Sequence, residues 1–346
     1  MTQLKDDLLN WVISEAYNLG FSEVESLVPL REQASLRNYF RIKTDIGSYV
    51  GVISDPESDM NLVFTNYSKF LLENNIKVPS VEAHNHEKGF LLLEDFGDKV
   101  LQLEINTLNI DSFIQSALKQ IALIQECESP RGAFELSEGV LIDQMYLFEH
   151  WLLGELINFK LSGNEKKIID DAYKVISKEC MGQEQYLCHF DFEFRNLMLL
   201  NDGAIGILDF QDLCKGPYAL DLVSILKDIE NPLTNGQIQI YLNFFCELAQ
   251  VPKTISRKSL SDLIRDIDFA GFQRQLRILG TLSRLHIRDK KSFRLNDLIQ
   301  TLDFLIDDSK KYRQLDEFNH LLEDKIKPKL IAAPVSYTHL TLPTKA

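Results

Sequence analysis

The stretch HFDFEFRNLMLLNDGAIGILDFQD, His189–Asp212, contains two apolar runs that flank the dipeptide Asp202-Gly203. An Asp-Gly pair between apolar runs is typical of a two-residue β-hairpin turn. With that turn, the numbers of directly paired residues sum to 405, so Asn196 faces Asp209. Directly paired residues in antiparallel strands have Cα atoms about 4.5–5.5 Å apart. The sequence therefore predicts an amide and a carboxylate side by side at the open end of the hairpin.

The same stretch has the spacing of a kinase-like catalytic loop. His189 and Asp191 precede Asn196, and Asp209 follows thirteen residues later. In such loops the first aspartate orients or deprotonates the acceptor hydroxyl, and the asparagine and second aspartate hold magnesium. Taken singly, Asp191 and Asn196 are better explained as turn caps, and His189 as a core residue. The complete set favours catalysis.

Asp221, in the segment GPYALDLVSIL, has two interpretations. It lies at the start of an apolar helix, where an aspartate is a common N-terminal cap. In kinase-like folds an aspartate there instead accepts hydrogen bonds from the backbone of the catalytic loop. The sequence leaves both open.

Composition narrows the class of protein and of partner. The chain has 346 residues, which favours two lobes over one core, and a net charge of −14 without a block of Lys or Arg. We expect neither nucleic acid nor a membrane as partner, and no apolar run is long enough to span a bilayer. The N-terminus does not resemble a secretory signal, and the five scattered cysteines fit reduced thiols. We expect a cytoplasmic monomer that acts on a small molecule.

The pattern of elements predicts an α+β fold with a small β-rich N-lobe and a larger helical C-lobe. Short alternating runs around residues 36–53 and 78–97 predict an antiparallel sheet that carries one helix, residues 60–73. Helical periodicity then predicts helices at 111–127, 142–161, 165–179, 219–229, 235–248, 259–285 and 295–325, after a first helix at 4–20. We expect an N-lobe at 1–97, a C-lobe at 98–330 and a disordered or non-native tail at 331–346.

Several segments together resemble the anomeric N-acetylmuramate/N-acetylglucosamine kinases of the aminoglycoside phosphotransferase superfamily. They are ASLRNYFRI, GFLLLEDFGD, HFDFEFRNLML, GILDFQDLCKGPYALDLVSILKD and FAGFQRQLRILGTLSRLHIRD. The resemblance runs from about residue 5 to 325. It implies a bilobal protein-kinase-like fold, ATP and Mg²⁺ as cofactors, and phosphorylation of the anomeric hydroxyl of an amino sugar in peptidoglycan recycling.

The resemblance also assigns roles to single residues. Asp191 is expected to be the catalytic base, with Asn196 and Asp209 as magnesium ligands. Glu94 to Phe96 are expected to present hinge backbone to adenine. The phosphate-covering turn corresponds to Arg31–Phe40, where no glycine is present and Ser35 is expected to contact phosphate. The lysine that kinases carry in the third strand is absent from SYVGVIS, so Arg41 or Lys43 is expected to replace it.

The sugar site is the least specified part of the prediction. Phe148 and Trp151 lie three apart in a predicted helix, which allows a platform for a pyranose ring, although such spacing also suits a core. Arg195, Arg274 and Arg277 are candidates for a carboxylate or a phosphate, with ion pairing as the alternative. Muramate and glucosamine remain equal candidates. Two other functions stay open: a kinase of an aminoglycoside or choline-like alcohol, and a nucleotide-binding pseudokinase.

Overall fold

The computed structural model describes residues 2–30, 37–292 and 294–333. The predicted phosphate-covering Ser35 and tail residues 334–346 lie outside these ranges. The chain forms two compact units: unit 1 comprises residues 1–132 and 191–213, and unit 2 comprises residues 133–190 and 214–346. Unit 1 therefore includes the catalytic-loop hairpin as well as the N-terminal sheet. The lobe boundary expected at residue 97 stays a prediction.

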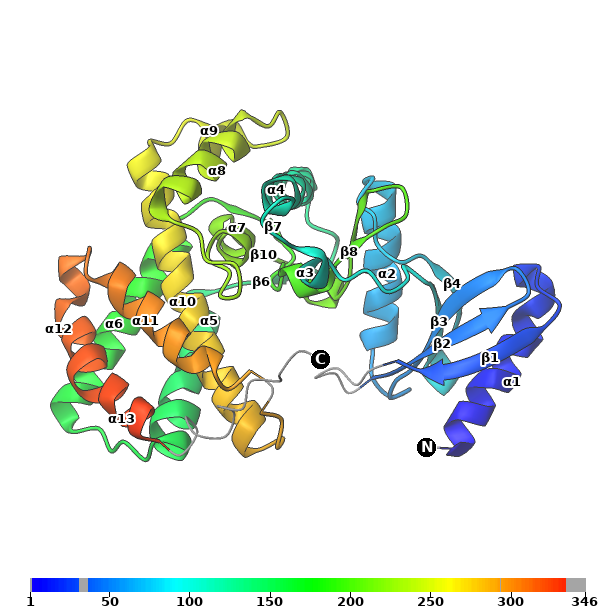
Figure 1. Cartoon of the computed structure of the whole chain (residues 1–346), viewed down its shortest axis with the longest axis horizontal. Coiled ribbons are helices and arrows are strands. Elements are labelled where there is room, and N and C mark those ends of the chain that lie inside the picture. Colours follow the sequence, from blue (N-terminus) through cyan, green and yellow to red (C-terminus); the bar gives the residue numbers. More distant parts are fainter. Residues whose placement is uncertain (1, 31–36, 293, 334–346) are drawn as a thin grey trace. The chain divides into compact units, whose positions relative to one another are not determined.

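Unit 1 is built on a five-stranded antiparallel sheet with the strand order β1-β2-β3-β5-β4 (Figure 1). The strands are β1 (Val24–Pro29), β2 (Asn38–Thr44), β3 (Gly47–Ile53), β4 (Val81–Asn85) and β5 (Phe90–Glu94). Strand β2 alternates, with Phe40 and Ile42 buried. They pack with Leu8 and Trp11 of α1 (Thr2–Leu19) in one hydrophobic cluster. The antiparallel sheet expected from the sequence is confirmed.

Further elements of unit 1 bring the hairpin and its supports together. They are α2 (Met60–Glu73), η1 (His86–Lys88), α3 (Leu101–Glu104), α4 (Ile110–Glu126), η3 (Phe194–Asn196), β8 (Leu197–Leu199), β9 (Ile205–Ile207) and η4 (Phe210–Asp212). The hairpin β8–β9 is held from both sides. The Leu199 amide donates to the Lys99 carbonyl (2.8 Å), and the Ile207 amide donates to the Lys77 carbonyl (2.8 Å).

Unit 2 is mainly helical. Its elements are β6 (Phe134–Glu135), α5 (Glu138–Leu147), η2 (Phe148–Leu156), α6 (Gly163–Met181), β7 (Gln185–Cys188), β10 (Cys214–Pro217), α7 (Ala219–Leu226), α8 (Asn235–Glu247), α9 (Lys253–Ser256), α10 (Leu260–Ile287), α11 (Asp297–Ser309), η5 (Arg313–Leu315), α12 (Asp316–Leu321), η6 (Leu322–Ile326) and α13 (Lys327–Ala332). Helix α10 contacts α5, α6, α7 and α11 (Figure 1). Strand β10 pairs with β6 and β7.

Two predicted helices differ from the structure. The helix expected at 142–161 is an α-helix only to Leu147 and continues as the π-helix η2. The helix expected at 295–325 is interrupted at Lys310–Tyr312, between α11 and η5. Residues 331 and 332 belong to α13, so the helical part extends two residues into the expected tail. Among the described residues, no helix has the length and apolar character that crossing a membrane requires.

Candidate active site

The hairpin of unit 1 differs by one residue from the predicted register. Leu197 pairs with Ile207 and Leu199 with Ile205, so paired numbers sum to 404. The Leu200 amide donates to the Ala204 carbonyl (3.0 Å), which leaves a three-residue turn, 201–203. A two-residue type I′ turn needs positive φ at both central residues, whereas a three-residue turn needs it only at its last residue. Gly203 has φ +82° and Asp202 does not have a positive φ, which explains the longer turn.

The predicted pairing of Asn196 with Asp209 is therefore wrong. The Leu208 amide donates to the Asn196 carbonyl (2.8 Å), so Asn196 faces Leu208, and Asp209 is the next residue along. Asp209 has φ +62° and ψ +37°, a left-handed conformation that is uncommon outside glycine. In a regular strand, neighbouring side chains point to opposite faces of the sheet. The left-handed conformation of Asp209 ends this alternation after Leu208. Gln211 donates its side-chain amide to Asp209 Oδ1.

The catalytic loop is tied together by its own side chains. Asn196 Nδ2 donates to the Asp191 carbonyl (2.9 Å) and to Asp191 Oδ2 (3.3 Å). Arg195 forms an ion pair with Glu193 (2.6 Å) and a longer contact with Asp191 Oδ2 (3.5 Å). Burial opposes the charge of Arg195, but Glu193, Asp191 and Asp209 raise its pKa above the ordinary value. One carboxylate, one amide and one guanidinium thus meet at Asp191, whose side chain is 30% exposed.

In unit 2, Asp221 holds the residues that lead into this loop. Its side chain is completely buried in α7, where Oδ2 accepts from the His189 amide (2.7 Å) and Oδ1 from the Phe190 amide (2.9 Å). Of the two interpretations of Asp221, the structure favours the acceptor of loop hydrogen bonds. Phe190 has φ +76°, so the buried carboxylate stabilises a strained backbone directly before Asp191. His189 is a buried residue of this support, 1% exposed.

The residues expected at the hinge form an ion-paired end to β5. Arg41 bonds to Asp95 (2.7 and 3.0 Å), to Asp98 (2.6 Å) and to the Gly97 carbonyl (3.0 Å). Burial by itself would raise the pKa of Asp95. Hydrogen bonds from Ser48, the Gly97 amide and Arg41 outweigh this effect and lower the pKa. The guanidinium of Arg41 thus lies beside residues 95–98, which follow β5. These contacts do not favour its predicted role at phosphate.

Two other hinge residues have defined neighbours. Glu94 accepts hydrogen bonds from the Ser80 amide (3.4 Å) and hydroxyl (3.2 Å), and its own amide donates to the Ser80 carbonyl (3.0 Å). Phe96 packs on Gly206 of β9, where a Cβ would lie only 2.5 Å from the ring. A glycine is thus required beneath Phe96. Contact of Glu94 and Phe96 with adenine stays a prediction.

The predicted aromatic platform is not present as described. Phe148 is completely buried, so its ring cannot receive a sugar. The predicted spacing assumed an α-helix, but both residues lie in η2, where the Ile157 amide bonds to the Leu152 carbonyl five residues back. In such a π-helix, residues three apart no longer share a face. Trp151 instead packs edge-on against His150, with ring centroids 4.7 Å apart.

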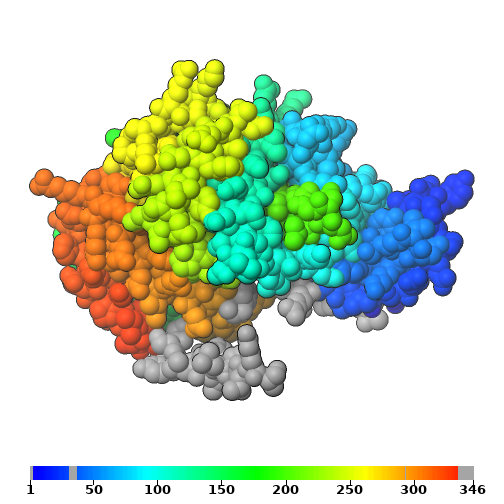
Figure 2. Space-filling view, turned by 45° about the horizontal axis from the view of Figure 1, so that its top comes forward, coloured from blue at the N-terminus to red at the C-terminus, as the bar shows by residue number. Residues whose placement is uncertain are grey.

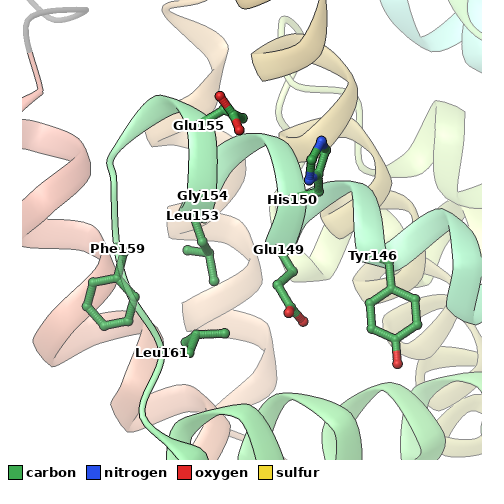
Figure 3. A pocket seen from close by; sticks show the side chains of 8 residues that line it. All are labelled: Tyr146, Glu149, His150, Leu153, Gly154, Glu155, Phe159 and Leu161. Carbon is green, nitrogen blue, oxygen red and sulfur yellow. The ribbon is translucent and has the colours of Figure 1, made fainter.

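A pocket of about 360 Å³ does open beside η2, within unit 2 (Figure 3). Phe148 and Trp151 do not line it. Residues that do include Tyr146, Glu149, His150, Leu153, Phe159 and Leu161. Of its two carboxylates, Glu149 forms an ion pair with Lys166 (2.8 Å), which also lies over the Tyr146 ring, and Glu155 is the other. Glu149 and Tyr146 are thus engaged by residues of α6.

The remaining candidates are placed as follows. Arg274 is buried and donates to the Ser224 hydroxyl (2.8 Å), and Arg277 lies over the Phe190 ring, 4.4 Å from its centroid.

The Cys188 thiol lies beside His189 in the sequence. Burial, and to a lesser extent nearby Asp221, raises the pKa of this thiol well above its ordinary value, which excludes a ready thiolate there. Sequence reasoning missed Glu193 and Gln211 as partners of Arg195 and Asp209, and it gave no role to Arg37.

A β-rich unit that carries Asp191 in the loop before a hairpin, with Asn196 and Asp209 at the open end of that hairpin, corresponds to the kinase-like class of phosphotransferases. The chain belongs to the phosphotransferase enzyme family (APH), whose model matches residues 26–254. This membership makes it an enzyme that transfers phosphoryl groups.

The comparisons with individual proteins agree with this membership. A protein of Pseudomonas aeruginosa named N-acetylmuramate/N-acetylglucosamine kinase is 28% identical over 309 residues, covering 88% of this chain and 90% of that protein. A protein of the same name from Neisseria meningitidis serogroup B is 25% identical over 299 residues, covering 85% and 88%. Among solved structures, choline kinase LicA from Streptococcus pneumoniae has a TM-score of 0.61 at 12% identity, covering 87% of this chain and 99% of that one.

A second structural relative is aminoglycoside 2'-phosphotransferase-IIIa in its GDP complex. It has a TM-score of 0.58 at 13% identity, covering 88% of this chain and 98% of that chain. At this level of identity the likeness concerns the fold alone. The bilobal kinase-like α+β class expected from the sequence is thereby confirmed.

Proposed function

We propose that this protein is an ATP-dependent kinase that phosphorylates the anomeric hydroxyl of N-acetylmuramate or N-acetylglucosamine, as a step in peptidoglycan recycling. The observation that carries the proposal is the hydrogen-bonded pair of Asp191 and Asn196 on the hairpin that also bears Asp209. The names of the relatives that match nearly the whole chain support the choice of an amino sugar. The nucleotide complexes of structural relatives support ATP as the donor.

In the proposed reaction, the Asp191 carboxylate accepts the proton of the anomeric hydroxyl. The sugar oxygen then forms a bond to the γ-phosphorus while the bond from that phosphorus to the β-bridging oxygen breaks, and ADP leaves. The Asn196 bond to Asp191 Oδ2 fixes the rotamer of the carboxylate. Arg195, paired with Glu193, adds positive charge beside it. Positioning and charge thus carry most of the catalysis.

The donor set fits magnesium. Because Asn196 Nδ2 is directed to Asp191, the amide oxygen of Asn196 is the atom available to a cation. Asp209 adds one carboxylate, and Mg²⁺ is commonly bound by one or two carboxylates together with substrate phosphates. When bound with ATP, magnesium neutralises the charge of the β- and γ-phosphates.

Phosphorus NMR of the product tests the proposal. Wild-type protein with ATP and Mg²⁺ is expected to convert N-acetylglucosamine or N-acetylmuramate to a sugar phosphate whose phosphorus couples to the anomeric proton. The methyl glycoside, which lacks a free anomeric hydroxyl, is the matched control and is expected to give no product. The Asp191→Ala variant is expected to lose two to four orders of magnitude in turnover, on the order expected for a lost general base.

Three results would contradict the proposal. Transfer to choline or kanamycin in place of the sugars would favour the alternative kinases. Phosphorylation of the methyl glycoside would move the reaction to another hydroxyl. Binding of ATP without transfer to any acceptor would favour a pseudokinase.

A further inference from the structure

Strand β3, GSYVGVI, has no lysine or arginine, although kinase-like enzymes use a lysine there to hold nucleotide phosphates. The two cations expected to replace it are placed elsewhere. Arg41 is engaged by Asp95 and Asp98 at the hinge, and Lys43 is exposed on β2. Another basic side chain of unit 1 is therefore a candidate for contact with the polyphosphate.

Arg37 is the buried basic residue among the described lysines and arginines of unit 1, with 7% of its surface exposed. It directly precedes β2. Arg37 Nη2 donates to the Met60 carbonyl (3.0 Å) at the start of α2. Its guanidinium also lies over the Phe64 ring, 5.3 Å from the centroid. The positive charge of Arg37 is thus held at the first turn of α2.

Aromatic packing connects the first turn of α2, where Arg37 lies, to the predicted magnesium ligand Asp209. The Phe64 ring stacks on Phe210, with centroids 4.5 Å apart and both side chains buried. Phe210 directly follows Asp209. A continuous row, Arg37 to Phe64 to Phe210, therefore ends beside the carboxylate expected to hold the metal. A cation and a metal ligand connected in this way are suited to one polyphosphate.

A second observation at the same place points to a missing ligand. Asn61, next to Met60, is 3% exposed, and neither its side-chain nitrogen nor its oxygen has a hydrogen-bond partner among the described residues. A buried polar group without a partner costs about 1–3 kcal/mol, and such groups in folded proteins usually indicate an absent ligand, ion or water.

We infer that Arg37 is the cation that contacts the polyphosphate of the nucleoside triphosphate, in place of the absent lysine of β3, and that Asn61 completes this site at the start of α2. The inference rests on the proposed function, because it concerns the nucleotide of the same reaction. It assigns to Arg37 a direct contact with the phosphates and to Phe64 a positioning role.

Equilibrium binding of ATP, ADP, AMP and adenosine to wild type and Arg37→Met tests the inference without any sugar. A lost charge-assisted hydrogen bond weakens binding about tenfold to a hundredfold. We expect this loss for MgATP, a smaller one for ADP and none for adenosine. Arg37→Lys is expected to recover part of the ATP affinity. Lys69→Met, which removes an exposed charge from the same helix, is the matched control and is expected to bind ATP like wild type.

Asn61→Leu gives a test that does not depend on tolerance of change at Arg37. This variant removes the unpartnered amide and is close to it in volume. We expect a higher melting temperature without nucleotide and a severalfold weaker affinity for MgATP. If Asn61 had a purely structural role, Asn61→Leu would change the melting temperature and leave the affinity for MgATP unaltered.

The outcomes separate the inference from the proposed function. ATP binding that is unchanged in Arg37→Met, or weakened equally for ATP and adenosine, would overturn the inference alone. Wild-type protein that binds MgATP with the expected phosphate dependence but transfers nothing to an amino sugar would overturn the proposed function alone.

Discussion

Asn196 donates two hydrogen bonds to Asp191, one to its carbonyl oxygen and one to its carboxylate. The loop 191–196 is therefore closed by a side chain that is also expected to present its amide oxygen to magnesium. In the proposed function, Asn196 would thereby couple the position of the Asp191 carboxylate to the position of the magnesium ion.

Asn196→Ala removes both functions. We expect turnover to fall and the magnesium concentration for half-maximal activity to rise by about tenfold to a hundredfold, the range seen when metal-orienting groups are lost. Initial rates over a magnesium titration measure this. Asn201→Ala, in the exposed turn of the same hairpin, is the control. A lower turnover with an unchanged magnesium requirement would contradict the ligand role.

Phe190 has φ +76° and is stacked by Arg277, so strain and side-chain packing oppose each other there. Phe190→Ala keeps the strain and loses the ring, whereas Phe190→Gly loses both. Because a left-handed conformation costs a non-glycine residue about 1–2 kcal/mol, the glycine variant is expected to be the more stable by about 1 kcal/mol. Urea unfolding of the two variants checks the order, and a more stable alanine variant would refute it.

Gly206 lies beneath the Phe96 ring, where a Cβ would approach to 2.5 Å. Gly206→Ala forces Phe96 or β9 to move and is expected to destabilise the protein by about 1–3 kcal/mol. Gly47→Ala is the control, because a Cβ there meets nothing within 4 Å. Chemical denaturation measures both. If Phe96 contacts adenine, Gly206→Ala also weakens adenosine binding, whereas Gly47→Ala does not.

The pKa of Asp95 is lowered from 3.8 in the folded state, despite burial, by Ser48, the Gly97 amide and Arg41. A carboxyl group with a lowered folded pKa adds stability above its unfolded pKa and loses it as the pH falls through the folded pKa. We therefore expect the stability difference between wild type and Asp95→Asn to be constant near neutral pH and to shrink below pH 3.8. Unfolding curves between pH 7 and pH 2.5 test this.

Asp98→Asn is the control for that experiment. Asp98 also pairs with Arg41, but its side chain is 81% exposed. Exposed ion pairs contribute about 0–1 kcal/mol, so we expect a small loss in this variant. An Asp95 effect that persists unchanged at pH 2.5 would show that the charge of Asp95 is not what stabilises the hinge.

The sequence was sufficient to predict that the hairpin and the antiparallel sheet exist, because both follow from alternating apolar residues and from turn residues. Asp221 needed the structure, since a cap and an acceptor of loop amides have the same sequence signature. The register of the hairpin failed by one residue because Asp-Gly suits more than one turn type, and only the φ of Asp202 separates them.

Other features could not be seen in a pattern of apolar residues. A π-helix has the same kind of composition as an α-helix, so the sequence does not show that the helix changes type at Phe148. It therefore could not decide whether Phe148 belongs to the core or to a sugar-binding platform. The burial of Arg37 against Phe64 depends on contacts with α2, which begins more than twenty residues later in the chain. The left-handed Asp209 likewise follows from its surroundings and not from its neighbours in the chain.

The turn 201–203 is exposed along its whole length, and its surface is green in Figure 2. It closes the end of the hairpin that is remote from Asn196 and Leu208, and loop tips of this kind accept inserted sequence. Relatives can therefore vary in length at this point without altering the chemistry. For the same reason, an epitope tag or a small fluorescent peptide inserted between Asp202 and Gly203 would report on the protein in cells while leaving its phosphoryl transfer intact.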